Sequence, residues 1–175
     1  MQQARVDKQA NSVEALYELY GDRIYHFCFE LCGNEADAED LAQDVFVSAH
    51  HSLPQFEGRS SVVTWLYGIA INRWNNLKRA TVPTRSLEGI PEGRASTGDR
   101  TSAQLERLSL EDALKTLPDP LREAFLLVRS EGLKYREAAE VLQVPLGTVQ
   151  SRVHAAAMHL RGRLADDRQR SPGGG

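Results

Sequence analysis

The sequence predicts an all-α protein with two small helical domains joined by a flexible linker, the second domain containing a helix-turn-helix. Apolar residues recur at spacings of three and four through both halves of the 175-residue chain, and no segment alternates like a strand. Between the halves, residues 82–103 contain two Pro, three Gly and several Ser and Thr without an apolar period. We therefore expect domains at residues 1–81 and 104–170, a linker at 82–103 and a disordered tail at 171–175.

The first half predicts three helices, of which the first two have clear end signals. Asn11, with Glu14 three residues later, is typical of a capping box at the start of the first helix. Gly33 and Asn34 can end this helix and begin a second, which we expect from about residue 35 to residue 52. The apolar stripe of the first helix comprises Leu16, Leu19, Tyr20, Ile24, Phe27, Cys28 and Leu31.

The third helix is predicted from Ser60 or Ser61, either of which can cap it, through Arg79. Its inner face is expected to contain Val62, Trp65, Leu66, Ile69 and the methylene groups of Arg73. Its last turns combine amide, basic and aromatic groups, namely Asn72, Arg73, Trp74, Asn75, Asn76, Lys78 and Arg79. Such groups suit single-stranded nucleic acid, because bases stack on rings while cations meet phosphates. A frayed polar helix end is the alternative interpretation.

The second half predicts helices at about residues 104–117 and 121–130, separated by a break at Pro118 and Pro120. Residues 134–161 then predict two short helices joined by a tight turn, a unit that places a helix in the DNA major groove. An ordinary helical hairpin is the alternative. The inward residues are expected to be Tyr135, Ala138, Ala139, Leu142, Val149, Val153, Ala156, Leu160 and Leu164. The outward face of the last helix would carry Thr148, Ser151, Arg152, Ala155 and His159.

Charge is distributed unevenly along the chain. Lys and Arg total 21 against 24 Asp and Glu, and the formal net charge of −3 argues mildly against DNA binding. Residues 1–81 carry a net charge of −4, whereas residues 104–175 carry +1. Acids at the start of the second helix suit the helix dipole, but Asp44 lies beyond the range of that effect. The acidic half can therefore meet a basic protein surface, unless it is only a solvated helix face.

Several classes of function are not favoured. Cys28 and Cys32 lie one turn apart on an apolar stripe, which favours core packing in a reducing compartment over a redox or metal role with His26. A polar N-terminus and the lack of a long apolar run predict a soluble cytoplasmic protein. Without a Walker loop, Gly-x-Gly-x-x-Gly or His-Glu-x-x-His motif, we expect no enzyme, catalytic residue, cofactor, metal or small-molecule substrate. An all-helical metal enzyme and a stand-alone helix-turn-helix regulator stay as alternatives.

Three segments occur in an order that points to one family. They are ADAEDLAQDVF at 36–46, FEGRSSVVTWLYGIAIN at 56–72 and GTVQSR at 147–152, and LPDPLREAFLLVRSEGLKYREAAEVL leads into the last. In these segments the chain resembles bacterial sigma factors of the extracytoplasmic-function group, the two-domain members of the housekeeping sigma family. The resemblance covers nearly the whole chain outside the linker. It implies an alternative sigma factor that directs promoter-specific transcription initiation, with sigma region two at 1–81 and region four at 104–170.

The resemblance also implies partners and site residues. The partners would be core RNA polymerase, through its β′ clamp and β subunit, promoter DNA, and an anti-sigma factor, commonly membrane-linked. The core-binding residues would be Asp37, Glu39, Asp40, Gln43 and Asp44. The minus-ten element would be opened and read by Ser60, Ser61, Asn72, Arg73, Lys78 and Arg79, and the minus-thirty-five duplex by Thr148, Gln150, Ser151 and Arg152. Basic residues are common in the family where Gln150, Ala155 and Ala157 stand, which predicts minus-thirty-five binding that is either weak or based on amide and methyl contacts rather than on phosphates.

Overall fold

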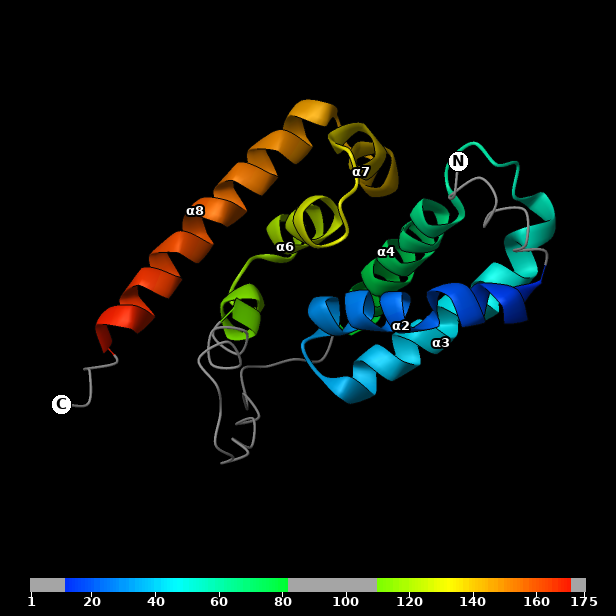
Figure 1. The fold of residues 1–175 in the computed structure, drawn as a ribbon, viewed down its shortest axis with the longest axis horizontal. Coiled ribbons are helices and arrows are strands. Elements are labelled where there is room, and N and C mark those ends of the chain that lie inside the picture. The colour runs from blue at the N-terminus through cyan, green and yellow to red at the C-terminus, as the bar shows by residue number, and fades with distance from the viewer. Residues whose placement is uncertain (1–11, 82–109, 171–175) are drawn as a thin grey trace.

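A computed structural model describes residues 12–81 and 110–170, and Figure 1 shows their arrangement. This part of the chain contains helices and turns and no strand, which confirms the predicted all-α class. The elements in order are α2 (Val13–Cys32), α3 (Glu35–Ser52), a 3-10 turn (Leu53–Gln55), α4 (Val62–Thr81), α6 (Asp119–Phe125), a π-helical turn (Leu126–Ser130), α7 (Tyr135–Leu142) and α8 (Leu146–Arg170). Residues 110–115, where the description of the C-terminal half begins, are also helical and precede α6. The predicted linker and tail lie outside the described residues.

Local sequence signals set the ends of α2 and α3. Ser12 caps α2, since its hydroxyl accepts a hydrogen bond from a backbone N–H three residues later. The cap therefore differs from the predicted Asn11, which lies outside the described residues. Gly33 ends α2 in the left-handed region at φ 78°, and the Asn34 side chain accepts from the backbone N–H of Asp37 to begin α3. This second boundary is confirmed.

The core of the N-terminal domain lies where α2 and α3 pack side by side against α4 (Figure 1). The Phe27 and Tyr67 rings join α2 to α4, with their centroids 4.7 Å apart. The prediction for Leu19 is wrong: its side chain is 44% exposed, because α3 and α4 cover a narrower stripe of α2. The buried residues of α2 are Leu16, Tyr20, Ile24, Phe27, Cys28 and Leu31.

The buried face of α4 also differs from the prediction. Ser61 begins the helix, since its Oγ accepts from the backbone N–H of Thr64 at 3.2 Å. Trp65 and Ile69 are only half-buried and Arg73 is exposed. The apolar residues that are buried are Val62, Val63, Leu66, Tyr67, Ala70 and Ile71. The buried face is wider than the predicted one and is rotated about the helix axis, because α4 packs on α2 and α3 and also on α7 of the C-terminal domain.

The C-terminal domain contains the predicted helix-turn-helix. α6 begins at Asp119, two residues before the predicted start, because Pro118 and Pro120 fit the N-terminal edge of a helix. Between α7 and α8, Gln143 adopts the left-handed region at φ 53° and turns the chain. The buried residues of α7 and α8 are Ala138, Val141, Val149, Val153, Ala156 and Leu160. Four predicted core residues are only half-buried, namely Tyr135, Ala139, Leu142 and Leu164.

Candidate functional site

The polar residues predicted on the second helix all lie on the exposed side of α3. Asp37, Asp40 and Asp44 share one stripe at helical spacing. The Asn34 amide donates to the Asp37 carboxylate at 2.8 Å, so Asp37 also belongs to the cap of α3. The full predicted set, Asp37, Glu39, Asp40, Gln43 and Asp44, is exposed.

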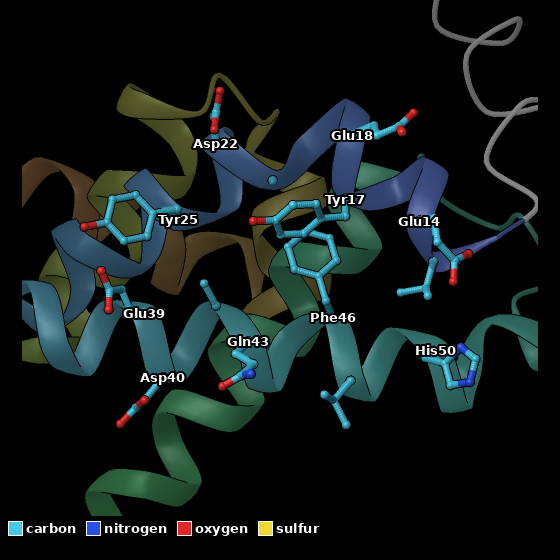
Figure 2. A pocket seen from close by; sticks show the side chains of 14 residues that line it. Glu14, Tyr17, Glu18, Asp22, Tyr25, Glu39, Asp40, Gln43, Phe46 and His50 are labelled. Carbon is cyan, nitrogen blue, oxygen red and sulfur yellow. The ribbon is translucent and has the colours of Figure 1, made fainter.

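A groove of about 1070 Å³ runs between α2 and α3 beside this stripe, and Figure 2 shows its lining. Tyr17 and Phe46 meet edge to face in it with their centroids 5.1 Å apart, and Tyr17 is 64% exposed. Five carboxylates from the two helices line the groove, namely Glu14, Glu18, Asp22, Glu39 and Asp40. An apolar surface within an acidic rim fits an amphipathic segment that carries basic residues.

The α2 side of this groove is absent from the sequence-based set of site residues. Glu14, Glu18 and Asp22 recur at a spacing of four, which places them on one helix face. This spacing would have revealed a second acidic stripe in the sequence. Only the packing of α2 on α3, however, brings that stripe opposite Glu39 and Asp40.

The predicted minus-ten residues are distributed along the whole of α4. Ser60 and Ser61 are half-buried at its N-terminal end, roughly 27 Å from Lys78 by helical rise. Halfway along the helix Asn72 and Arg73 are exposed, and the Arg73 guanidinium donates through Nε to the Ser48 hydroxyl of α3 at 2.8 Å. The structure therefore presents an amide and a guanidinium together near the middle of the helix.

The two basic residues in the C-terminal turn of α4, Lys78 and Arg79, form contacts within the protein. Arg79 is exposed, and its Nε donates to the backbone carbonyl of Asn75 at 3.3 Å. The Lys78 ammonium lies 5.2 Å from the centroid of the Trp74 ring, an arrangement that favours a cation. Lys78 also forms an ion pair with α6, in which its Nζ lies 2.8 Å from Oε1 of Glu123.

The N-terminal turns of α8 present the predicted minus-thirty-five residues. Gln150 and Ser151 are exposed, whereas Thr148 and Arg152 are half-buried. The Ser151 hydroxyl donates to the backbone carbonyl of Thr148 at 3.0 Å, which is local to the helix. Arg152 is the cation of this group, in agreement with the few basic residues noted in the sequence. On the same outward face Ala155 and His159 are exposed, and His159 hydrogen-bonds Thr116 at 3.1 Å.

The two cysteines are free thiols in the core region. Burial raises the pKa of Cys28 far above its ordinary value, and burial together with the nearby Asp37 carboxylate raises the pKa of Cys32 to about 12. Both thiols are therefore protonated at neutral pH, whereas the reactive form of a cysteine is the thiolate. Within residues 12–81 and 110–170, no three His, Cys, Asp or Glu side chains gather in a group that could hold a metal ion. None of the helices described combines the length and apolarity needed to cross a bilayer.

Comparison with known proteins assigns both domains. Residues 16–82 match the domain family described as Sigma-70 region 2, and residues 107–160 match Sigma-70 region 4. The ECF RNA polymerase sigma factor SigE of Mycolicibacterium smegmatis is 35% identical over 88% of this chain, which spans 62% of SigE. The sigma factor YlaC of Bacillus subtilis is 33% identical over 93% of this chain and 97% of its own length.

A solved structure gives the same result. The sigma factor RpoE in complex with the anti-sigma factor NepR from Bartonella quintana is 26% identical, with a TM-score of 0.70 over 87% of this chain and 96% of that chain. The fold and the surfaces above therefore define a two-domain transcription factor with sigma regions 2 and 4. The chain belongs to the extracytoplasmic-function RNA polymerase sigma factors.

Proposed function

We propose that this chain binds core RNA polymerase through α3 and the adjoining groove and directs the enzyme to specific promoters. The observation that carries the proposal is the exposed acidic stripe beside an aromatic groove on the region 2 domain. Carboxylates attract a basic surface, and Tyr17 with Phe46 supplies apolar contact area. The β′ clamp of the polymerase, with the β subunit nearby, is the partner we assign to this surface.

Promoter DNA is the second partner, and α4 is the element we assign to the minus-ten strand. A base removed from the duplex stack costs a few kcal/mol, which a protein pocket must offset. Exposed amide and cationic groups on α4 suit that task, because amides read base edges and guanidinium groups contact phosphates. The assigned residues are Ser60, Ser61, Asn72, Arg73, Lys78 and Arg79.

We assign the minus-thirty-five duplex to the N-terminal turns of α8. A recognition helix of a helix-turn-helix lies in the major groove with its first residues on base edges. Thr148, Gln150, Ser151 and Arg152 occupy those positions. Within the part of α8 whose side chains are described, the exposed Arg residues come only later, at Arg161 and Arg163. Contacts through amide and hydroxyl groups therefore take a larger share of this interface.

The protein in this proposal does no chemistry of its own, and needs no cofactor, metal or small-molecule substrate. It lends sequence specificity to the polymerase and acts in the cytoplasm, within the broader family that includes housekeeping sigma factors. An anti-sigma factor, membrane-linked or not, is the proposed inhibitor and would compete for the stripe of Asp37, Asp40 and Asp44. A stand-alone regulator would use α7 and α8 and leave the acidic groove without a role.

Run-off transcription with purified core polymerase on genomic fragments tests the proposal. We expect the chain alone to convert core enzyme into one that initiates at discrete promoters, after treatment of all components with a chelator followed by magnesium for the polymerase. Core polymerase without the chain is the control. If no discrete product appears, and the chain does not comigrate with core on size exclusion, the proposed function is wrong.

A further inference from the structure

A serine of α3 holds an arginine of α4 where the two helices pack against each other. Nε of Arg73 donates to Oγ of Ser48 at 2.8 Å, so the hydrogen bond crosses from one helix to the other. Arg73 is exposed and Ser48 is half-buried. A hydrogen bond that water can replace adds little net stability. Its main effect therefore falls on the position of the Arg73 side chain.

The Ser48 hydroxyl is itself fixed by the backbone of α3. Its Oγ lies 2.6 Å from the carbonyl oxygen of Asp44, one turn earlier in the helix. A guanidinium group can only donate hydrogen bonds, so Ser48 accepts from Arg73 and gives its own proton to the Asp44 carbonyl. The acceptor of Arg73 is thus set by a helix backbone rather than by another flexible side chain.

This hydrogen bond leaves most of the guanidinium available to a ligand. The group has five N–H donors, which form one fork through Nε and a second fork through Nη1 and Nη2. Ser48 occupies the Nε position. Among the residues that the structure describes, Nη1 and Nη2 of Arg73 have no hydrogen-bond or ion-pair partner. The terminal fork can therefore bind two oxygens of one phosphate.

The acceptor is also neutral, and in this respect Arg73 differs from the cation at the end of α4. The ammonium of Lys78 lies 2.8 Å from a carboxylate oxygen of Glu123, which offsets its charge. The hydroxyl of Ser48 holds Arg73 without such an offset. A phosphate gains most from a cation that no carboxylate already neutralises. Arg73 is thus both ordered and fully charged.

We infer that Ser48 is a positioning residue for promoter binding, which holds Arg73 so that Nη1 and Nη2 meet a backbone phosphate beside the base that Asn72 reads. The inference rests on the proposed function, because it deepens the role assigned to α4. A long side chain loses rotamer freedom when it binds, and Ser48 imposes part of that loss before DNA arrives. Since phosphate contacts fix the register of a protein on DNA, an ordered Arg73 also places Asn72 at its base.

Variants of Ser48 in the full chain separate order from charge. Ser48→Ala removes the acceptor, Ser48→Thr keeps a hydroxyl, and Ser48→Asp keeps an acceptor but neutralises Arg73. Ser52→Ala and Ser52→Asp are the matched controls, because Oγ of Ser52 likewise donates to the carbonyl one turn earlier, at 2.7 Å, and has no partner in the described part of α4. Alanine has the higher helix propensity, so Ser48→Ala should fold normally, which circular dichroism verifies.

Binding is measured with holoenzyme assembled from core polymerase and the full chain, on a labelled fork-junction DNA that carries a minus-ten element identified by run-off transcription. We expect Ser48→Ala to weaken binding about fivefold without a change in the salt dependence, because Arg73 loses order but keeps its charge. Ser48→Thr should restore wild-type binding. Relative to Ser52→Asp, Ser48→Asp should also reduce the slope of the salt dependence by about one.

Two further measurements link the effect to Arg73. In an Arg73→Ala background, Ser48→Ala should cause no additional loss of binding, because the side chain that it positions is absent. NMR of the isotope-labelled chain without DNA or polymerase reports the order of the Arg73 Nε–H bond directly. This bond should be ordered in the wild type and in Ser48→Thr, and mobile in Ser48→Ala.

Four results would overturn the inference: Ser48→Ala binds DNA like the wild type, Ser52→Ala weakens binding equally, the full loss persists in the Arg73→Ala background, or Arg73 is as mobile in the wild type as in Ser48→Ala. In each case a wild-type holoenzyme that initiates at promoters keeps the proposed function. If the wild-type chain forms no promoter complex with core polymerase, the proposed function fails, and the role of Ser48 in DNA binding fails with it.

Discussion

The N-terminal domain carries its exposed charge mainly as carboxylates around an aromatic groove, whereas the recognition helix of the C-terminal domain offers few cations for DNA. The groove is lined by five carboxylates and by Tyr17 and Phe46. The first turns of α8 contain Arg152, and the next outward position is Ala155. In the proposed function, the N-terminal domain would bind a protein through carboxylates and aromatic rings, and the C-terminal domain would bind DNA with few phosphate contacts. Attachment to polymerase would raise the effective concentration of the C-terminal domain at the promoter.

The largest change in this difference between the domains is expected from a reversal of charge on α3. Asp40→Lys with Asp44→Lys should weaken core polymerase binding by at least about a hundredfold, because a basic partner surface then meets like charge. Pull-down of core enzyme with quantitative titration measures the loss. The matched control, Asp112→Lys with Glu140→Lys, changes the charge equally on the other domain and should bind normally. Undiminished binding by the α3 variant would remove this stripe from the interface.

The next largest effect is expected on α4. Asn72 is exposed and its amide has no assigned structural role, so Asn72→Ala should reduce open-complex formation by about tenfold without loss of fold. Permanganate reactivity at the minus-ten element measures opening. A pre-melted template is the control, and the loss should be smaller there because the strands are already apart. Equal loss on both templates would instead indicate base reading, and no loss would exclude Asn72.

A cation added to α8 tests whether the small number of cations on the recognition helix limits its binding to DNA. Ala155→Arg places a guanidinium on the exposed face of the recognition helix. It should tighten binding to a minus-thirty-five duplex by a few-fold and steepen the salt dependence by about one unit of slope. Met158→Arg makes the same charge change at a position that is 55% exposed but lies three residues further from the N-terminal turns of α8, and should do less. Equal effects would mean that α8 binds DNA by net charge alone.

A pH-dependent effect is expected where the domains meet. Burial and the nearby carboxylates of Glu131 and Glu111 raise the pKa of Glu30 from 4.5 to about 7. The folded chain therefore holds a proton that the unfolded chain has lost, and stability falls as pH rises from about 4.5 through 7. Glu30→Gln removes this loss and should raise the melting temperature at pH 8 by about 2–4 °C, with little change at pH 5. A shift independent of pH would contradict this account.

The smallest effects concern two glycines whose surroundings differ. Gly68 lies within α4 with open space at its missing Cβ, so Gly68→Ala should stabilise the fold by about 1 kcal/mol. Gly33 adopts φ 78°, and a Cβ there would meet the Lys115 side chain of the other domain at 3.3 Å. Gly33→Ala should therefore destabilise by about 1 kcal/mol. Chemical denaturation measures the free energy of unfolding of both variants. Changes of the same sign would show that local backbone conformation does not decide these stability effects.

Helix ends and the core stripe of α2 were largely predictable because they depend on neighbouring residues. Gly33 and Asn34 mark a boundary that backbone conformation and side-chain capping dictate locally. Apolar spacing likewise identified most buried residues of α2 and α8. Spacing failed for α4, where Tyr67 and Ala70 are buried and Trp65 is not, because α2, α3 and α7 all cover this helix.

By itself the sequence determined the all-α class, the order of the helices, the helix-turn-helix and the sigma factor family, since these follow from local patterns and motifs. Tertiary structure alone decided that Glu14, Glu18 and Asp22 face the acids of α3 across one groove. It also decided that Lys78, which looks like an open phosphate contact in the sequence, meets a carboxylate 45 residues away. The physical reason is that such contacts depend on how helices pack, which no local pattern encodes.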